Sequence, residues 1–157
     1  MKKSGMINLY NVSFGVTSAI MTSLVLITSL SGAANRIALI TSLLVIAIAD
    51  NVSDSFGIHV FQESKNIVPR EVKRTTTNNF VARMLITFVF ILFVLCLPVY
   101  LTIILSIIFG LAILTFLSYF ISKNQKINPY RAIARHLLLA IVLMSASFIL
   151  KYVILKF

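Results

Sequence analysis

The sequence predicts an all-α integral membrane protein with five transmembrane helices, its N-terminus in the cytoplasm and its C-terminus outside. Three observations predict this fold. The 157 residues are 59% hydrophobic and only 11% charged, with a mean hydropathy of +1.01, whereas about a quarter of the residues in a soluble domain are charged. The apolar residues gather in tracts of the length that a bilayer requires, about 20 residues. Most basic residues fall in the short segments between these tracts.

We expect a single transmembrane domain over residues 1–157, with spans at about 12–33, 37–59, 80–100, 102–121 and 132–155. The first span closes at Ser31–Gly32, and it is too long and too rich in hydroxyl groups for a removable signal peptide. The third and fourth spans share one apolar tract. Pro98 favours a tight hairpin at about Leu97–Thr102, because proline lacks a backbone donor. A single kinked helix over this tract is the alternative.

The segments between the spans indicate the orientation. Residues 64–79 are predicted to form a short basic cytoplasmic loop or a short surface helix, with Asn78 or Asn79 as the N-cap of the third span. A second basic segment precedes the fifth span, whereas the segment after the first span holds only Arg36. The positive-inside rule places the two basic segments in the cytoplasm. We expect the membrane to be the plasma (inner) membrane of a prokaryote.

Several classes of function are excluded at this stage. The net charge of +10 does not indicate nucleic-acid binding, because the basic residues lie where the positive-inside rule puts them. Cys96 is the single cysteine, so an internal disulfide is impossible. HExxH, glycine-rich phosphate-loop and GxSxG motifs are absent, and we expect neither an enzyme nor a tightly bound cofactor. Met21, Met84 and Met144 are interpreted as core residues rather than as metal ligands.

Acidic residues gather in the second span. Asp50, Asp54 and Glu63 are three of only four acidic residues in the chain. If the span begins at Ile37, a rise of 1.5 Å per residue places Asp50 about 20 Å and Asp54 about 26 Å along it, inside an apolar layer ~30 Å thick. Carboxylates at such depths are costly and usually have a function. The second span is therefore where we expect the chemistry.

Asp50 and Asp54 are four residues apart and share a helix face. Two such carboxylates repel each other, and either a divalent cation or a proton removes the repulsion, which is the basis of metal–proton exchange. The alternative is that they pair with Arg83, Arg135 or backbone donors and only hold helices together. We predict a metal or proton site at the two aspartates. The other predicted site residues are Asn51 and Ser53 beside the pair, Ser18, Thr22 and Gly57 along the ion path, and His59 and Glu63 where ions enter from the cytoplasm.

Two short segments resemble the vacuolar iron transporter family. Residues 11–27 read NVSFGVTSAIMTSLVLI, in which Gly15 to Ser18 is similar to the GxVTT part of the family's first-helix pattern. In the second helix, Ala49, Ser53 and Gly57 fit the family pattern AxAISMGxG at the same spacing. The resemblance implies five spans, a cytoplasmic N-terminus and a homodimer with the ion path at the subunit interface, which exports ferrous or manganous ions in exchange for protons.

The chain departs from that family at several positions. The family's acidic residue of the first helix falls at Phe14, its methionine of the second helix at Asp54 and a following glutamate at Ile58. The glutamate-rich cytoplasmic insert of the family is missing from the short segment 64–79. If the chain transports a metal, Asp50 and Asp54 replace the missing acid and the methionine. Such an all-oxygen ligand set favours Mn²⁺, Mg²⁺ or Fe²⁺ over softer metals.

The sequence thus predicts a homodimeric transporter that exports a divalent cation from the cytoplasm in exchange for protons. Fe²⁺ and Mn²⁺ are the preferred candidates for this cation. Its expected partners are the lipid bilayer, the metal ion and a second copy of the chain. We expect no binding of nucleic acid. Two rivals remain. One is a non-transporting assembly or scaffold protein whose aspartates bind a partner, and the other is an acid-lined cation channel.

Overall fold

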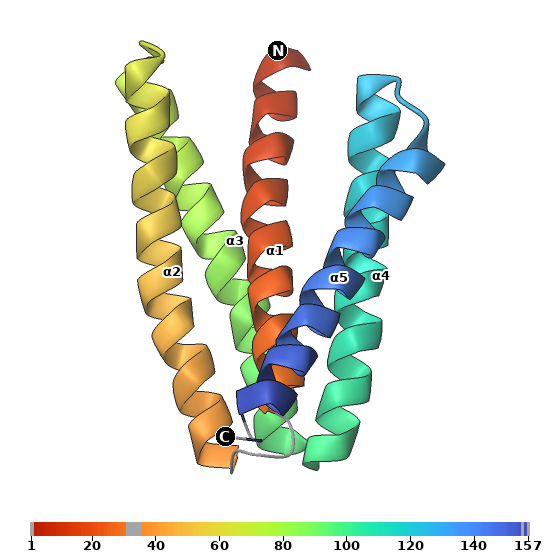
Figure 1. Cartoon of the computed structure of the whole chain (residues 1–157). Coiled ribbons are helices and arrows are strands. Elements are labelled where there is room, and N and C mark those ends of the chain that lie inside the picture. Colours follow the sequence, from red (N-terminus) through yellow and green to blue (C-terminus); the bar gives the residue numbers. More distant parts are fainter. Residues whose placement is uncertain (1, 31–35, 155, 157) are drawn as a thin grey trace.

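The chain folds into an up-and-down bundle of long helices (Figure 1). The structure, a computed structural model, describes residues 2–30, 36–154 and 156, with side chains for 12–30, 36–153 and 156. The helices in this part are α1 (Lys2–Leu30), α2 (Arg36–Ser64), α3 (Pro69–Cys96), α4 (Val99–Gln125) and α5 (Pro129–Ile154). All five are long and apolar enough to cross a membrane. The prediction of an all-helical protein with five such helices is confirmed.

Helix α1 is the centre of the bundle and contacts each of the other four helices (Figure 1). On one side α3 packs against both α1 and α2, and on the other side α4 and α5 pack against each other and against α1. Ile20, Leu24 and Ile27 of α1 are fully buried in the apolar core. Gly110 lets α4 approach α1 closely, because a Cβ atom there would stand 2.9 Å from Leu24 Cδ1.

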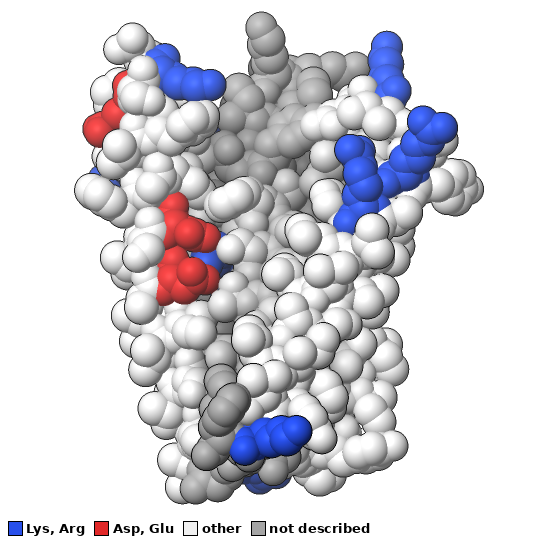
Figure 2. Space-filling model, in the orientation of Figure 1, with Lys and Arg blue, Asp and Glu red and all other residues white. Residues whose placement is uncertain are grey.

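Basic side chains gather at the end of the bundle where α2 joins α3 and α4 joins α5, as Figure 2 shows. We call this end the basic end; the lysines and arginines there whose side chains the structure describes are Lys65, Arg70, Lys73, Arg74, Lys123, Lys126, Arg131 and Arg135. Arg36, Lys151 and Lys156 belong to the segments at the other end. Helix α1 begins at the basic end, and α5 ends at the opposite end (Figure 1).

The segment 64–79 differs from its prediction. Helix α2 continues to Ser64 and α3 already begins at Pro69, so only residues 65–68 connect them. Asn66 has a positive φ of 54°, and the amide of Ile67 donates to the Gln62 carbonyl at 3.3 Å, which is the way a left-handed residue ends a helix. Proline suits the first turn of the next helix, where its missing N–H costs nothing.

The expected loop over 64–79 and the expected N-cap at Asn78 or Asn79 are therefore wrong. Both asparagines lie inside α3, and Asn79 is fully buried. The polar run before Phe80 indicated a helix start because such residues often face water, but in this protein part of the run faces the interior of the bundle. The predicted closure of the first span at Ser31–Gly32 and Ala33, and the predicted last span residue Leu155, lie outside the described residues.

The break between α3 and α4 falls at Pro98, as predicted. The helices are separated only by Leu97 and Pro98, so the single kinked helix is wrong and the hairpin is tighter than the expected Leu97–Thr102. The buried Thr102 hydroxyl lies 3.1 Å from the Phe93 carbonyl and 3.2 Å from the Pro98 carbonyl. Arg36 Nη2 donates to the Leu97 carbonyl at 2.6 Å. Arg36 thus supplies a donor to a carbonyl just beyond the end of α3, whereas the Phe93 and Pro98 carbonyls also accept the backbone amides of Leu97 and Thr102.

Candidate functional site

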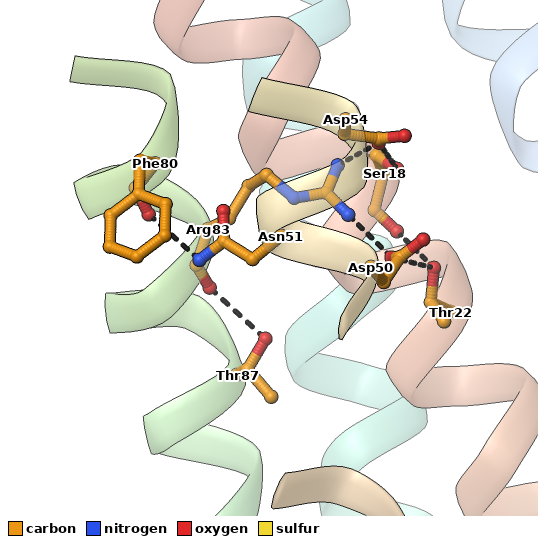
Figure 3. A network of polar contacts seen from close by, with 8 residues as sticks. All are labelled: Ser18, Thr22, Asp50, Asn51, Asp54, Phe80, Arg83 and Thr87. Atoms are coloured by element: carbon orange, nitrogen blue, oxygen red, sulfur yellow. Dashed lines mark hydrogen bonds and ion pairs between the residues drawn. The ribbon is translucent and has the colours of Figure 1, made fainter. Parts of the chain in front are cut away.

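One arginine joins the two aspartates. Arg83 of α3 donates from Nη1 to Oδ2 of Asp54 and from Nη2 to Oδ2 of Asp50 (Figure 3). The Arg83 side chain is only 2% exposed, whereas those of Asp50 and Asp54 are 36% and 32% exposed. We call these three residues the Asp–Arg triad. The pairing with Arg83, which the sequence left open as an alternative, is thus present in the structure, whereas the alternative partner Arg135 is exposed.

Local geometry explains why the triad forms. Asp50 and Asp54 stand one turn apart on α2, and the planar guanidinium fork presents two donors at fixed spacing that can reach both carboxylates. The axial position of α2 relative to α3 is fixed at the residue after Asp50, where Asn51 Nδ2 donates to the Phe80 carbonyl at 3.1 Å (Figure 3). Asn51, a predicted ligand, therefore ties the two helices together and does not approach the carboxylates with its amide nitrogen.

Two hydroxyl groups of α1 complete the contacts of the triad. Ser18 Oγ donates to Asp54 Oδ2 at 3.2 Å. Thr22 Oγ1 lies 3.5 Å from Asp50 Oδ2 and 2.9 Å from the Ser18 carbonyl. A threonine hydroxyl has one proton to donate, and the shorter contact is the better hydrogen bond. Ser18 is therefore a real partner of the triad, and Thr22 is a neighbour within reach. Both were predicted to lie along the ion path.

Each aspartate keeps one oxygen free. Among the described residues, the hydrogen bonds and ion pairs of Asp50 and Asp54 all end on Oδ2. The Oδ1 atoms point away from Arg83 (Figure 3). Acidic atoms are visible at the surface about halfway along the bundle in Figure 2. With Arg83 charged and both aspartates ionised, the triad carries a net charge of −1, which a hydrocarbon environment strongly disfavours.

A groove opens beside Asp54. It has a volume of about 450 Å³ and is lined by Phe14, Ser53, Asp54, Gly57, Ile58 and Phe61. Gly57 borders open space, since a Cβ atom there would meet nothing within 4 Å. The groove brings the predicted residues Ser53 and Gly57 next to one carboxylate. Phe14, which stands where the resembled family has an acid, also lines the groove and gives it an apolar wall.

The remaining predicted residues lie farther along α2. His59 Nε2 and Glu63 Oε1 form a pair at 3.2 Å, and their side chains are 38% and 61% exposed. This pair stands in the last turns of α2, at the basic end. His136 of α5 is instead engaged by Ser118 of α4 at 2.6 Å, as a helix-packing contact.

Arg83 is the residue whose importance for the site the sequence analysis underestimated. It was considered only as one of several possible partners, although an arginine preceding a long apolar stretch of α3 is as unusual as an aspartate in α2. In the part of the chain that the structure describes, no three His, Cys, Asp or Glu side chains come close enough to share a metal ion. The site can therefore supply two carboxylates, a guanidinium and hydroxyl groups. No protein-family model, curated protein or solved structure matches this chain.

Proposed function

We propose that the chain is an integral membrane transporter that exchanges a divalent cation of the iron or manganese type for protons at Asp50 and Asp54. The observation that carries this proposal is the one-sided arrangement of the triad. Arg83 occupies one oxygen of each carboxylate, and the other oxygen of each remains free and points away from it (Figure 3). Carboxylate oxygens are the ligands that hard divalent cations and protons share.

Charge explains how protons and the metal ion compete. The triad carries −1 when both aspartates are ionised, and one proton brings it to zero. A divalent cation on the free oxygens brings it to +1 and repels Arg83, so the ion-bound state loosens the contacts of the guanidinium. A site in an apolar surrounding is most stable when it is neutral. Release of the metal ion is therefore favoured by uptake of a proton, which is the coupling that an antiporter needs.

Access and assembly belong to the same proposal. The basic end faces the cytoplasm by the positive-inside rule, which puts the N-terminus inside and the C-terminus outside. Ions then enter near His59 and Glu63 and leave toward the opposite end, so the direction is export. The exposed carboxylates require cover within a membrane, and a second copy of the chain over this face of α1 and α2 provides it. The resemblance to the vacuolar iron transporters implies such a homodimer, and we expect the membrane to be a plasma membrane.

A second candidate function is a membrane assembly or scaffold protein. The observation that favours it is the buried position of Arg83, which holds α2 against α3 through both carboxylates. Buried polar networks of this kind specify how helices pair, whether or not they bind anything else. In a scaffold, the free carboxylate oxygens face a basic group of a partner protein.

Metal-driven proton movement in proteoliposomes tests the two functions. The purified protein is reconstituted with a pH dye inside, and Mn²⁺ or Fe²⁺ is added outside. We expect proton movement in the wild type, none in Asp50→Asn/Asp54→Asn, and normal movement in the matched control Glu71→Gln, which removes an exposed carboxylate of α3 outside the triad. Folded wild-type protein without flux for either ion contradicts the transporter and favours the scaffold.

A further inference from the structure

Among the described residues, buried polar atoms without partners are concentrated on α2 and α3. Among the described side chains, eight buried nitrogen and oxygen atoms make no hydrogen bond, and all but that of Ser106 on α4 belong to these two helices. We call the six residues that carry the other seven atoms the polar seam: Asn51, Ser55, Gln62, Thr76, Asn79 and Arg83. Folded proteins leave only a few such atoms per 100 residues unpaired, and each needs an explanation.

The polar seam extends from the basic end to the Asp–Arg triad. The hydrogen bond from Asn51 to the Phe80 carbonyl fixes the axial position of α2 relative to the antiparallel α3. Gln62 lies two residues before the end of α2, which is about 16 Å from Asn51 at 1.5 Å per residue. On α3, Thr76, Asn79 and Arg83 follow one another at about 5 and 6 Å along the axis. A single water can bridge polar atoms about 5–6 Å apart, since each hydrogen bond is about 2.8 Å long.

The inner end of the polar seam has room for a water next to an aspartate. A cavity of about 10 Å³ is lined by Ala19, Thr22, Ser23, Ile46, Ala47, Asp50, Asn51, Arg83 and Thr87. A volume of roughly 10–15 Å³ holds one water if two to four polar groups surround it. Asn51 and Arg83, which line this cavity together with Asp50, each carry an unpaired polar atom, Oδ1 and Nε respectively.

We propose that waters fill the polar seam and form a proton path between the basic end and the Asp–Arg triad. A proton enters at the basic end on the first water, each water takes up one proton and passes on another, and the last water donates to an aspartate oxygen. The waters are unchanged, and the charge of the triad rises from −1 to zero. Arg83 keeps its proton throughout. The transport role rests on the proposed function above, but hydration of the polar seam does not.

The alternative is a dry polar seam, which is energetically unfavourable. A buried polar atom without any hydrogen bond costs about 1–3 kcal/mol in proteins, and no solvent is available within a bilayer to relieve that cost. Five of the six side chains of the polar seam are less than a tenth exposed, so bulk water does not satisfy them from outside. Internal waters relieve this cost, because a buried water typically makes two to four hydrogen bonds to such groups.

Reactivity of introduced cysteines toward Ag⁺ tests the hydration. In a Cys96→Ala background, Ser55→Cys places a thiol in the polar seam. Ser106→Cys is the matched control, because Ser106 is also a buried serine with an unpaired hydroxyl but stands on α4, outside the polar seam. Ag⁺ is applied to membrane vesicles of either orientation, and Lys65→Cys identifies which side the basic end faces. The thiols left unreacted are counted by maleimide labelling in detergent.

We expect Ser55→Cys to react with Ag⁺ from the side of the basic end at least tenfold faster than Ser106→Cys. Equal rates for the two serine positions, or faster reaction of Ser55→Cys from the opposite side, overturn the proposal. This measurement needs no transport activity, so a fast Ser55→Cys in a protein without ion flux would refute the proposed function and leave the hydrated polar seam standing.

The proton path has its own measurement. Asn79→Leu removes both unpaired atoms of Asn79 and keeps the number and branching of its side-chain heavy atoms, and Ser55→Ala is the milder second variant. We expect each to slow metal-driven proton movement, Asn79→Leu at least tenfold, while the equilibrium affinity of the purified protein for Mn²⁺ changes less than twofold. Unchanged proton movement in both variants overturns the path. Loss of Mn²⁺ affinity equal to the loss of rate also overturns it, because the residues then act only by holding the triad.

Discussion

Gly15 of α1 packs directly against Asn79 of α3. A Cβ atom on Gly15 would overlap Asn79 Oδ1 and would stand 2.9 Å from both the Asn79 carbonyl oxygen and Arg83 Cγ. Real side chains do not tolerate such contacts, and one of the atoms is backbone that cannot turn aside. The glycine of the GxVTT-like segment therefore has a physical role in this protein. It lets α1 approach α3 closely, and about one turn farther along α1 the Ser18 hydroxyl reaches Asp54 of α2.

Gly15→Ala is expected to lower the free energy of unfolding by about 1–3 kcal/mol, the usual cost of overpacking. The added methyl group pushes Asn79 and Arg83 away and so weakens the triad as well. Gly57→Ala is the matched control, because its methyl group enters open space and alanine favours the helix. Thermal unfolding in one detergent measures both variants. Equal midpoints for the two alanine variants would show that α1 and α3 do not touch at Gly15.

Arg83→Met is expected to destabilise the protein by about 3–5 kcal/mol, since removing one partner of a buried ion pair leaves the other charge uncompensated. Adding Asp50→Asn and Asp54→Asn to Arg83→Met removes the uncompensated carboxylate charges. We expect this triple variant to recover most of the stability that Arg83→Met loses. The four variants of this cycle, compared by thermal unfolding, isolate the coupling between Arg83 and the aspartates. A triple variant no more stable than Arg83→Met would contradict the pairing.

Hydropathy and helix spacing were sufficient to predict the number of helices, the break at Pro98 and the shared face of Asp50 and Asp54. These features depend on local properties: apolar length, a missing backbone donor and a repeat of 3.6 residues. Ser18, which was predicted to lie along the ion path, donates to Asp54 in the structure; its role in transport stays a prediction. The contact of α1 with α3 at Gly15 was not foreseen, because a glycine in an apolar helix has no preferred neighbour.

The partners of polar side chains could not be predicted, because they depend on how the helices are paired in space. Arg83 has no feature in the sequence that selects it over Arg135 as the partner of the aspartates, until α3 is placed beside α2. Asn79 looked like a helix cap because caps and buried amides use the same residue type. Asn51 was expected to act as a ligand beside the aspartates, but its amide nitrogen is hydrogen-bonded to the Phe80 carbonyl. The axial register of α2 against α3 determines the partners of all three side chains.

Thr102→Val is expected to lower the free energy of unfolding by about 1 kcal/mol, the net value of one hydrogen bond. The Thr102 hydroxyl reaches the Phe93 carbonyl of α3 across the turn between α3 and α4, and valine has the same shape without the donor. Thr115→Val is the control, because that hydroxyl contacts only the Leu111 carbonyl of its own helix, which remains bonded in the helix. Equal thermal midpoints for the two variants would show that the turn does not depend on Thr102.

Glu63→Gln and His59→Ala are expected to change stability by less than about 0.5 kcal/mol, because an exposed pair is weak and screened by solvent. If ions enter the protein at this pair, however, both variants slow Mn²⁺ flux in proteoliposomes at low ionic strength. A carboxylate near the entrance raises the local concentration of cations, and salt removes this effect as the Debye length shortens to about 8 Å at 0.15 M.

The slowing by Glu63→Gln should therefore shrink as salt is raised from about 0.01 M to 0.15 M, over which range the Debye length falls from about 30 Å to about 8 Å. Glu71→Gln controls for the general loss of negative charge at the basic end, since Glu71 is exposed in the first turn of α3. A flux loss that is the same at every salt concentration would argue against electrostatic guidance and for direct coordination of the ion by Glu63. Identical losses in Glu63→Gln and Glu71→Gln would mean that the charge of the whole basic end, rather than this pair, attracts the ion.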